Sequence, residues 1–535
     1  MHGKHPTISS LHGVVAAAHP LAAQAGAKLL ASGGNAFDAA AATAAALNVV
    51  EPFMSGLAGL GYATCYVAAQ KQVRVLDFAP LVPSRLPVER FTRREDLRYG
   101  ALSVGTPGNL AGWAELVRAH GRKPLKDALQ SAIGLARDGF ALAEFGVAEF
   151  NEHIPLLRGQ AALYDDWAKN YTGGTAPVAL GRIIRQPDLA RTLEALASNG
   201  PGYLYGGALG EMIVAHLAKL GGCLTLGDLE AVKPTWKEPL TANYRGLTVN
   251  TLPPPSEAFQ FLLTLRILDG FDLARMERNG VEHLDTVWRS IRLAAGERIA
   301  NNFPTAATLS QLLSDANVER LRARVRDGKP VDGPTEQWTP QPAAGAGHKE
   351  HHTTSFSIAD RDGNVVCVTQ SLGSPFGSGV VVPGTGLCLN NFLYWADINP
   401  ASPNRTKPGG ALPVCMAPSV SLREGKPVLA LGTPGSYGIL QTQVQALVQH
   451  LDFGSPLQEA IEQPRARLWD GRLVEPESRF EPAVLDKLVE RGHTIQRSGA
   501  WIMRVGGMQG VAIDPATGLM TGACDPRRDG YVAPA

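Results

Sequence analysis

The spacing of hydrophobic residues predicts mainly helices in the first part of the chain. Residues 17–50 carry small apolar residues at helical spacing and predict two helices, which separate at the glycines of "SGGNAFD". Residues 108–328 are mostly helical in pattern, with a long amphipathic stretch from about 281 and a strand-like interruption at 247–255. Residues 61–80 instead alternate and are rich in β-formers, so they predict a hairpin.

The pattern changes to that of strands after residue 352. "TSFSIA" and "VVCVTQS" alternate on either side of "DRDGN", where Asp362-Gly363 favours a tight hairpin. Further hairpins are predicted at 419–432 and 509–524, and the helices between them include one at about 481–492. Hairpins interleaved with helices favour antiparallel sheets that are covered by helices.

A segment of different character separates these two parts. Residues 328–352 contain many Pro and Gly residues and little periodicity, so we expect an exposed, mobile linker. By length alone, a chain of 535 residues could form two or more domains. The linker ends at His352, directly before Thr353-Thr354 and the first predicted strand, which makes this junction the candidate place for chemistry.

Composition places the chain among ordinary globular proteins. Apolar residues make up 44%, charged residues 19%, and the formal net charge is +1. No Lys- or Arg-rich run with interleaved aromatic residues occurs, so we expect neither a nucleic-acid nor a membrane partner. The polar start "MHGKHPTISSLHG" and the apolar stretch broken by Pro20 match neither a signal peptide nor a membrane span, and we expect a cytoplasmic location. Six cysteines without a C-x-x-C pair predict buried thiols.

Thr353 is the candidate nucleophile. If the chain were cut before it, its hydroxyl would lie beside its own α-amino group, whose ordinary pKa of about 8 suits a base near neutral pH. From spacing alone, two threonines before a strand are more simply explained by β-propensity. A second feature is "LALGTPGSYGILQT", where the N–H groups of Gly435 and Ser436 could stabilise an oxyanion. The alternative there is an ordinary strand-to-helix turn.

Two other polar clusters have simpler explanations. "HKEHH" could bind a metal through His348, His351 and His352, but no carboxylate or cysteine cluster accompanies it, so a solvated run is the preferred interpretation. We therefore expect no metal and no cofactor. "DPRRDG" at 525–530 predicts a salt-bridged turn with a structural role.

Six blocks of sequence occur in order between about residues 13 and 531: "AAAHPLAAQAGAKLLASGGNAFDAAAATAAALNVVEPFMSGLAGLGY", "SVGTPGNLAGW", "HHTTSFSIADRDGNVVCVTQSL", "FGSGVVVPGTGLCLNN", "LALGTPGSYGILQT" and "GACDPRRDG". Together they resemble the γ-glutamyltranspeptidase family of N-terminal nucleophile hydrolases. The resemblance implies an α+β fold, a four-layer αββα sandwich of two antiparallel sheets covered by helices. It also implies a precursor that cuts itself before Thr353. Residues 1–352 and 353–535 would then be a large and a small subunit that stay associated in one composite domain.

The resemblance also implies roles for the residues of the junction. Thr353 would first attack the carbonyl of His352 and later a substrate amide, forming an acyl-enzyme. Ser371, with Thr369 nearby, matches a second hydroxyl that supports the nucleophile in the family. The N–H groups of Gly435 and Ser436 would hold the oxyanion.

Several positions depart from the pattern that binds a γ-glutamyl group. Ala79 stands where such members have an arginine that pairs with the substrate α-carboxylate. Gly373 replaces an amide side chain, and Val414-Cys415 replace two serines. Each change removes a polar contact from the implied substrate pocket.

Aromatic residues follow Asn391 at two further substrate-binding positions. Phe392 and Trp395 stand where transpeptidases have polar and acidic residues that hold the α-amino group. We expect both to line the pocket from the end of a strand, with Tyr394 on the opposite face by alternation; core packing of all three is the alternative. Five polar contacts are thus missing together, and the predicted pocket is aromatic and apolar.

The leading hypothesis is a self-processing N-terminal threonine amidohydrolase or acylase that cleaves a small-molecule amide whose acyl part is not γ-glutamyl. That acyl part could be dicarboxylic, aromatic or small. One alternative is a γ-glutamyl hydrolase or transpeptidase of glutathione-type substrates, in which Arg74 or Arg85 replaces the missing arginine. Another is a catalytically silent family member. A homo-oligomer is compatible with the sequence. The sequence does not distinguish hydrolysis from acyl transfer.

Overall fold

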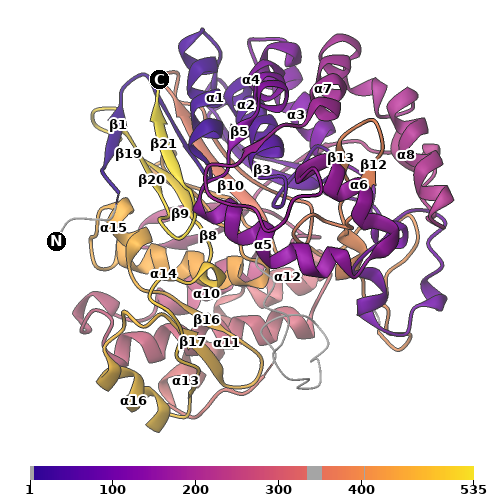
Figure 1. The fold of residues 1–535 in the computed structure, drawn as a ribbon. Coiled ribbons are helices and arrows are strands. Elements are labelled where there is room, and N and C mark those ends of the chain that lie inside the picture. Colours follow the sequence, from indigo (N-terminus) through magenta and orange to yellow (C-terminus); the bar gives the residue numbers. More distant parts are fainter. Residues whose placement is uncertain (1–4, 334–351, 403) are drawn as a thin grey trace.

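Two β-sheets stacked face to face form the centre of the protein, and helices cover both outer faces (Figure 1). The computed structural model describes residues 5–333, 352–402 and 404–535. Within these residues each of the two sheets has seven strands, and all neighbouring strands in them are antiparallel. The predicted four-layer αββα sandwich is confirmed.

Both sheets combine strands from before and after Thr353. The first sheet contains, in spatial order, β21 (Tyr531–Pro534), β2 (Gly13–Ala17), β10 (Thr354–Asp360), β11 (Val365–Ser371), β3 (Leu60–Val67), β4 (Gln72–Phe78) and β7 (Thr235–Lys237). The second contains β1 (Ile8–Ser10), β20 (Met520–Cys524), β19 (Gln509–Ile513), β15 (Lys426–Gly432), β14 (Ser419–Arg423), β9 (Leu247–Thr251) and β8 (Leu240–Tyr244). The smaller sheets pair β5 (Phe140–Ala141) with β6 (Ile183–Ile184), β12 (Val381–Val382) with β13 (Leu387–Cys388), and β17 (Leu473–Pro476) with β16 (Ala466–Leu468) and β18 (Thr494–Ile495).

The helices divide between the two outer faces. Those packed on or beside the first sheet are α1 (Pro20–Ala31), α2 (Ala36–Val50), α3 (Asn109–His120), α4 (Leu125–Asp138), α5 (Glu144–Arg158), α6 (Ala161–Tyr171), α7 (Pro187–Asn199), α8 (Ala208–Lys219) and α9 (Leu226–Glu230). Those on the side of the second sheet are α10 (Phe259–Leu268), α11 (Val281–Ala300), α12 (Ala306–Leu312), α13 (Asp315–Arg326), α14 (Ile439–Leu451), α15 (Leu457–Glu462) and α16 (Pro482–Glu490) (Figure 1).

The predicted hairpins and helices lie where the patterns placed them. The stretch 61–80 forms β3 and β4, the stretch after Thr353 forms β10 and β11, and 419–432 and 509–524 form β14–β15 and β19–β20. The amphipathic stretch from 281 is α11. Most of the predicted linker 328–352 falls in 334–351, outside the described residues.

Strand β2 was not predicted, because its apolar residues run without a break. Val15 and Ala17 pack against the helices of the first sheet, while Val14 and Ala16 face the second sheet. A strand buried on both faces shows no polar alternation, and its sequence cannot be distinguished from a buried helix by period alone. The first helix consequently begins at Pro20, three residues later than residue 17 of the prediction.

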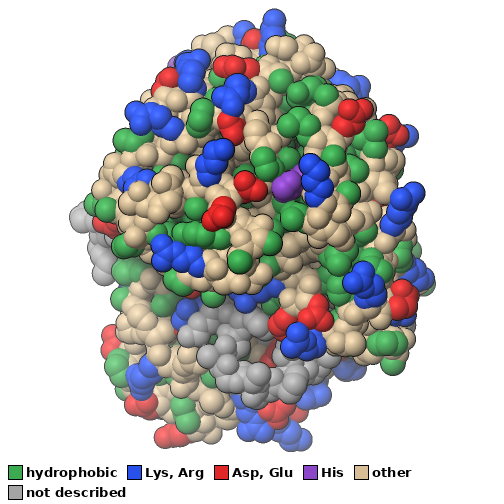
Figure 2. Space-filling model, turned by 45° about the vertical axis from the view of Figure 1, so that its right-hand side comes forward, with side chains coloured by type: hydrophobic (Ala, Val, Ile, Leu, Met, Phe, Trp, Pro, Cys, Tyr) green, Lys and Arg blue, Asp and Glu red, His purple; other side chains and the backbone are tan. Residues whose placement is uncertain are grey.

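The surface and the cysteines agree with the composition. Figure 2 shows Lys and Arg side chains interspersed with Asp and Glu side chains over one face. All six cysteines are free; Cys223 is half-buried and the other five are buried. Among the helices that the structure describes, none combines the length and apolar character needed to cross a membrane.

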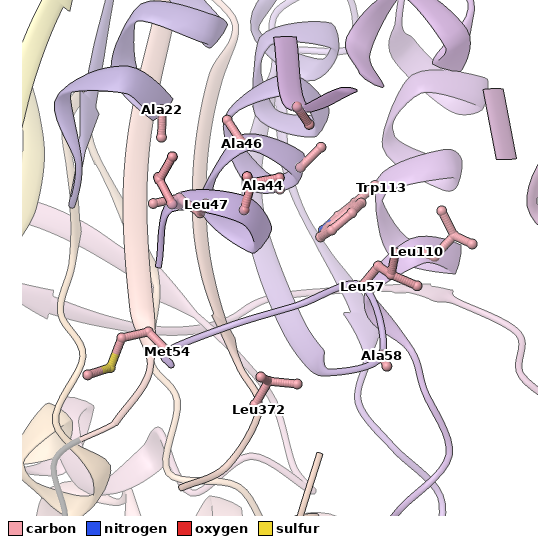
Figure 3. Close-up of a cluster of buried hydrophobic side chains, with 14 of the residues drawn as sticks. Ala22, Ala44, Ala46, Leu47, Met54, Leu57, Ala58, Leu110, Trp113 and Leu372 are labelled. Carbon is pink, nitrogen blue, oxygen red and sulfur yellow. The ribbon is translucent and has the colours of Figure 1, made fainter. Parts of the chain in front are cut away.

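Helix α2 is buried along its whole length and positions the end of the first sheet. Its alanines allow close packing against α1 and α4, and Figure 3 shows Ala44 of this helix on the side of Trp113 and Leu47 on the side of Ala22. The Asn35 side chain accepts hydrogen bonds from the N–H groups of Phe37 and Asp38. The Asp38 side chain accepts one from the N–H of Asn35, which completes a capping box. The helix therefore begins where the sequence predicted.

The two sheets approach each other closely at Gly522 of β20. A Cβ atom on this residue would lie 2.3 Å from Cγ1 of Val532 and 2.7 Å from Cγ1 of Val14, both of which belong to the first sheet. Any side chain here would push the sheets apart.

We expect Gly522→Ala to lower the free energy of unfolding by about 1–3 kcal/mol, because the added methyl group overpacks the space between the sheets. Gly134 is the matched control, since a Cβ atom there meets nothing within 4 Å and the residue lies inside helix α4. Gly134→Ala is expected to stabilise the protein by about 0.5–1 kcal/mol. Urea denaturation followed by circular dichroism measures both, and equal effects would contradict the packing argument.

Candidate active site

Thr353 lies at the start of β10 in an unusual backbone conformation. It is 5% exposed and its φ is +100°. A β-branched residue rarely adopts positive φ, and such a conformation costs about 1–3 kcal/mol. The next residue, Thr354, is already paired with Gln370 of β11. The sheet thus holds the His352–Thr353 peptide unit in a strained geometry.

The Thr353 hydroxyl is directed toward Ser371, as the resemblance implied. Oγ1 of Thr353 donates a hydrogen bond to Oγ of Ser371 at 3.1 Å. The N–H of Gly373 also donates to Oγ of Ser371, at 2.9 Å. Thr369 is buried on the same strand, and its hydroxyl has no hydrogen-bond partner among the described residues. Ser371 is therefore the hydroxyl that orients Thr353.

A backbone donor from the second sheet reaches the carbonyl group that precedes Thr353. The chain turns after β15, and the N–H of Gly435 donates to the carbonyl oxygen of His352 at 3.1 Å. Gly435 has a φ of +130°, which requires glycine, and the following Ser436 has a φ of +54°. A carbonyl held by such a donor is polarised for attack.

The hydroxyl of Thr353 opens into a cavity of about 20 Å³, enough room for roughly one water molecule. Most of its wall is apolar or aromatic. It is lined by His352, Thr353, Ser371, Gly373, Phe392, Trp395, Val414, Cys415, Met416 and Ser436. Five of the seven predicted substrate-binding residues line the cavity: Gly373, Phe392, Trp395, Val414 and Cys415. Met416 lines it as well and was not predicted.

Ala79 and Asn391 do not line the cavity. The N–H of Ala79 donates to Oδ1 of Asp77 at 3.0 Å, in the turn after β4. Asn391 is buried, where its Oδ1 accepts from the N–H of Ser374 at 2.7 Å and its Nδ2 donates to the carbonyl oxygen of Arg98 at 2.9 Å. Asn391 therefore holds the cavity wall together instead of facing a substrate.

Gly373 is required by this arrangement. A Cβ atom on Gly373 would lie 2.2 Å from Oδ1 of Asn391 and 3.2 Å from Cζ3 of Trp395, and its φ is +99°. The amide side chain that the family pattern has here cannot fit beside these neighbours.

The aromatic residues lie on a 3₁₀ turn, Phe392–Trp395, so the predicted strand end is wrong. Residues three apart eclipse each other on such a turn. Phe392 and Trp395 accordingly stack, with ring centroids 5.5 Å apart and planes inclined by 24°, and both line the cavity. Tyr394 points elsewhere, and the guanidinium of Arg94 lies 3.9 Å from its ring centroid. The expected separation of Tyr394 from the other two comes from this turn, because alternation along a strand would have placed Phe392 and Tyr394 on the same face.

The turn 525–530 contacts the site, which the sequence analysis did not predict. Asp525 and Arg527 form a buried ion pair at 3.0 Å, and this part of the turn is structural as expected. Arg528 instead donates from Nη1 to the carbonyl oxygen of Thr353 at 2.9 Å. The sequence carries no signal for this contact, because Arg528 bonds to a backbone carbonyl group.

Two carboxyl groups are buried near Arg528. Burial raises the pKa of Glu51 to about 7, and the positive charge of Arg528 partly opposes this shift. Burial raises the pKa of Glu149 to about 8, again opposed by Arg528. Oγ1 of Thr354 donates to Oε2 of Glu51 at 2.8 Å. Arg528 and these two carboxyl groups lie outside the mostly apolar lining of the cavity, and the charge of the carboxyl groups depends on pH.

The suggested histidine metal site receives no support from the described residues. His348 and His351 lie outside them, and His352 lies in the cavity beside Thr353. Among the residues that are described, no three His, Cys, Asp or Glu side chains are grouped as metal ligands.

Comparison with known proteins gives consistent relatives. The gamma-glutamyltranspeptidase family model matches residues 22–535. The acylase ACY 1 proenzyme of Pseudomonas sp. (strain SE83) is 33% identical, over 98% of this chain and 93% of that protein. The glutathione hydrolase proenzyme of Bacillus subtilis (strain 168) is 31% identical, over 97% of this chain and 90% of that protein. A crystal structure of cephalosporin acylase from Bacillus halodurans superposes with a TM-score of 0.89 at 30% identity, covering 100% of this chain and 98% of that one.

The raised pKa of Glu149 predicts a specific pH dependence of stability. Above the ordinary glutamate pKa, the folded protein binds this proton more tightly than the unfolded chain, so the free energy of unfolding falls as pH rises toward about 8. Glu149→Gln, uncharged at every pH, should show a smaller decline between pH 5.5 and 8.5. Urea denaturation in a Thr353→Ala background, which is expected to remain one chain, measures the difference. Glu152→Gln, exposed on the same helix, is the control, and identical pH dependences for Glu149→Gln and the parent would contradict the prediction.

Proposed function

Because the chain belongs to the gamma-glutamyltranspeptidase family, it is a hydrolase or acyltransferase, and we propose that it is a self-processing acylase whose nucleophile is Thr353. The hydrogen bond from the N–H of Gly435 to the carbonyl oxygen of His352 is the observation that carries this proposal. This bond polarises the carbonyl group that would be attacked in self-cleavage. The hydroxyl that would attack it belongs to the next residue, Thr353, so both reacting groups lie in one site.

Self-cleavage begins when the Thr353 hydroxyl oxygen attacks the carbonyl carbon of His352. The resulting oxyanion is stabilised by the N–H of Gly435, and the N–H of Ser436 on the same turn is a second donor in the proposal. The C–N bond then breaks, the nitrogen takes the proton from the hydroxyl, and an ester joins the two residues. Water hydrolyses this ester, which leaves a carboxylate on His352 and a free α-amino group on Thr353.

Substrate turnover repeats this chemistry at the newly formed chain end. The α-amino group of Thr353, with an ordinary pKa of about 8, accepts the hydroxyl proton while Oγ1 attacks the substrate amide. The same proton passes to the leaving amine, and an acyl-enzyme remains. Water releases the acid in a hydrolase, and an amine would accept the acyl group in a transferase.

The two products of cleavage, residues 1–352 and 353–535, would remain one folded body. Strand β10 of the small product lies between β2 of the large product and its own β11, and β11 pairs in turn with β3 of the large product. In the second sheet, β14 pairs with β9 in the same manner. Separation would break strand pairing in both sheets.

The wall of the cavity favours an acyl group with apolar or aromatic surface, although in the uncut chain the space holds only about one water molecule and must widen to admit such a group. Phe392, Trp395 and Val414 supply contact area, whereas a γ-glutamyl group would bring two charges that need partners. Neither arginine suggested as a replacement lines the cavity: Arg74 pairs with Glu238 at 3.1 Å, and Arg85 is exposed. An unpaired buried charge costs several kcal/mol, so a zwitterionic acyl group is disfavoured. The likeness to an acylase proenzyme supports this choice, and the glutathione hydrolase relative supports the alternative.

Replacing the nucleophile tests the proposed cleavage. Thr353→Ala is expected to remain a single chain of 56.7 kDa, because no hydroxyl is left to attack, whereas Thr353→Ser should still be cut. The wild-type products should weigh about 37 and 19 kDa in proportion to their lengths. Amidase activity of Thr353→Ala should fall by about 10³-fold or more. Denaturing gels and mass spectrometry give the result, and cleavage of Thr353→Ala at the same bond would refute the mechanism.

A panel of p-nitroanilides tests the acyl preference. An arylacetyl derivative is expected to exceed γ-glutamyl-p-nitroanilide in kcat/KM by about 10²-fold or more, because the cavity lacks partners for the γ-glutamyl charges. A glutaryl derivative, which keeps one of these charges, should fall between the two. Replacing an apolar wall residue, as in Trp395→Ala, should raise KM for the arylacetyl substrate. Preferential turnover of the γ-glutamyl substrate would favour the glutathione-type alternative. A correctly cut protein without activity on any amide would favour a silent family member.

A further inference from the structure

We propose that Arg528 is a positioning residue that anchors the backbone of the nucleophile, both in the uncut chain and after the His352–Thr353 bond is broken. The inference rests on the proposed role of Thr353 and concerns how that residue is kept in place. Arg528 acts through Thr353 and makes no contact with the cavity that would receive the substrate.

The guanidinium of Arg528 is held on several sides. Nη1 donates to the carbonyl oxygen of Thr353 at 2.9 Å and lies 3.7 Å from Sδ of Met54, and the side chain covers the ring of Phe145 with Cζ 5.0 Å from the centroid. Gly507 passes so close that a Cβ atom there would lie 2.5 Å from Cδ of Arg528. With 5% of its surface exposed, Arg528 has little freedom to move away from Thr353.

A second contact holds the next residue. Oγ1 of Thr354 donates to Oε2 of Glu51 at 2.8 Å, and Glu51 ends the fully buried helix α2. The opposite charges of Arg528 and Glu51 act on each other, since Arg528 opposes the rise in the Glu51 pKa. Thr353 is therefore held by Arg528 and Thr354 by Glu51, and the opposite charges of Arg528 and Glu51 attract each other.

Cleavage makes this anchor necessary. Before it, Thr353 is fixed on both sides by peptide bonds, but afterwards its N-terminal side is free, and chain ends fray unless they are tied down. The same residue must then place its hydroxyl and its α-amino group against Gly435. The contacts that remain beyond the Thr353 side chain are the Thr353 carbonyl, held by Arg528, the strand pairing of Thr354 with Gln370, and the Thr354 hydroxyl, held by Glu51. A displacement of about 1 Å at such a site can cost roughly 10²-fold in rate.

The neighbouring arginines have a different function, which separates positioning from general stability. Arg465 and Arg527 both bond to Asp525 and hold the turn to its surroundings. Arg528 donates a hydrogen bond to the carbonyl oxygen of Thr353 instead. Removal of Arg528 should therefore affect rates at Thr353 beyond any loss of stability.

The test compares Arg528→Gln, Arg528→Lys and Thr354→Val in the full-length chain. Three quantities are measured: the rate of self-cleavage of freshly purified precursor, kcat and KM on the p-nitroanilide that the wild type turns over fastest, and the thermal midpoint. For Arg528→Gln we expect self-cleavage and kcat to fall about 10–100-fold with KM changed less than about threefold. Arg528→Lys retains a donor and should recover part of both rates. Thr354→Val, which loses the Glu51 contact, should lower kcat by a smaller factor.

Arg292→Gln is the matched control. Arg292 is buried and donates to the backbone carbonyl oxygens of Trp469, Gly471 and Leu473, so its loss disturbs the turn between β16 and β17 and removes no contact of Thr353 (Figure 1). It should lower the thermal midpoint while kcat of the folded protein stays near the wild-type value.

The outcomes separate the two proposals. Normal self-cleavage and normal kcat in Arg528→Gln would overturn the positioning role, and so would rate losses equal to those of Arg292→Gln. If Arg528→Gln does not fold, unchanged rates in both Arg528→Lys and Thr354→Val would overturn it. Cleavage of the Thr353→Ala chain would instead refute the proposed function, whatever the arginine variants do.

Discussion

The fixed orientation of one peptide unit, His352–Thr353, is the constraint on which the site depends. Gly435 holds its carbonyl group, Ser371 holds the hydroxyl that follows, and Arg528 holds the next carbonyl. These contacts keep Thr353 at a positive φ that a β-branched residue would otherwise avoid. The surrounding structure maintains the strained φ angle of Thr353. Cutting the His352–Thr353 bond would release this strain, because φ is defined by the carbonyl carbon of His352, which is then no longer attached.

The fold supplies these contacts from separate layers. Thr353 directly precedes strand β10 of the first sheet, and Gly435 follows strand β15 of the second sheet. The wall of the cavity comes from the 3₁₀ turn Phe392–Trp395 and from residues 414–416. In the sequence, both lie after strand β11 of the first sheet and before strand β14 of the second sheet. Because each layer is covered by helices, the reactive groups are buried and ordered before any substrate arrives.

Much of this architecture could be predicted from the sequence, and the exceptions have physical causes. Hairpins such as 419–432 were recognisable because one face of each strand differs from the other. Strand β2 is buried on both faces and lacks that signal. In the site, Thr353, Ser371 and Gly435 lie together as the family pattern implied. The contact of Arg528 could not be predicted, because a backbone carbonyl group is present at every residue and does not depend on the side chain of Thr353. The packing of Asn391 against Gly373 could not be predicted either, since it depends on a steric conflict visible only in three dimensions.

The placement of nucleophile and oxyanion donor on opposite sheets has a consequence for biogenesis. A partly folded chain in which the sheets have not yet stacked would have its hydroxyl but no donor near the carbonyl, and so could not break the bond. If the chain is cut as proposed, cleavage would occur only in molecules whose two sheets have stacked. The ratio of uncut to cut polypeptide in a cell would then report how completely the population has matured.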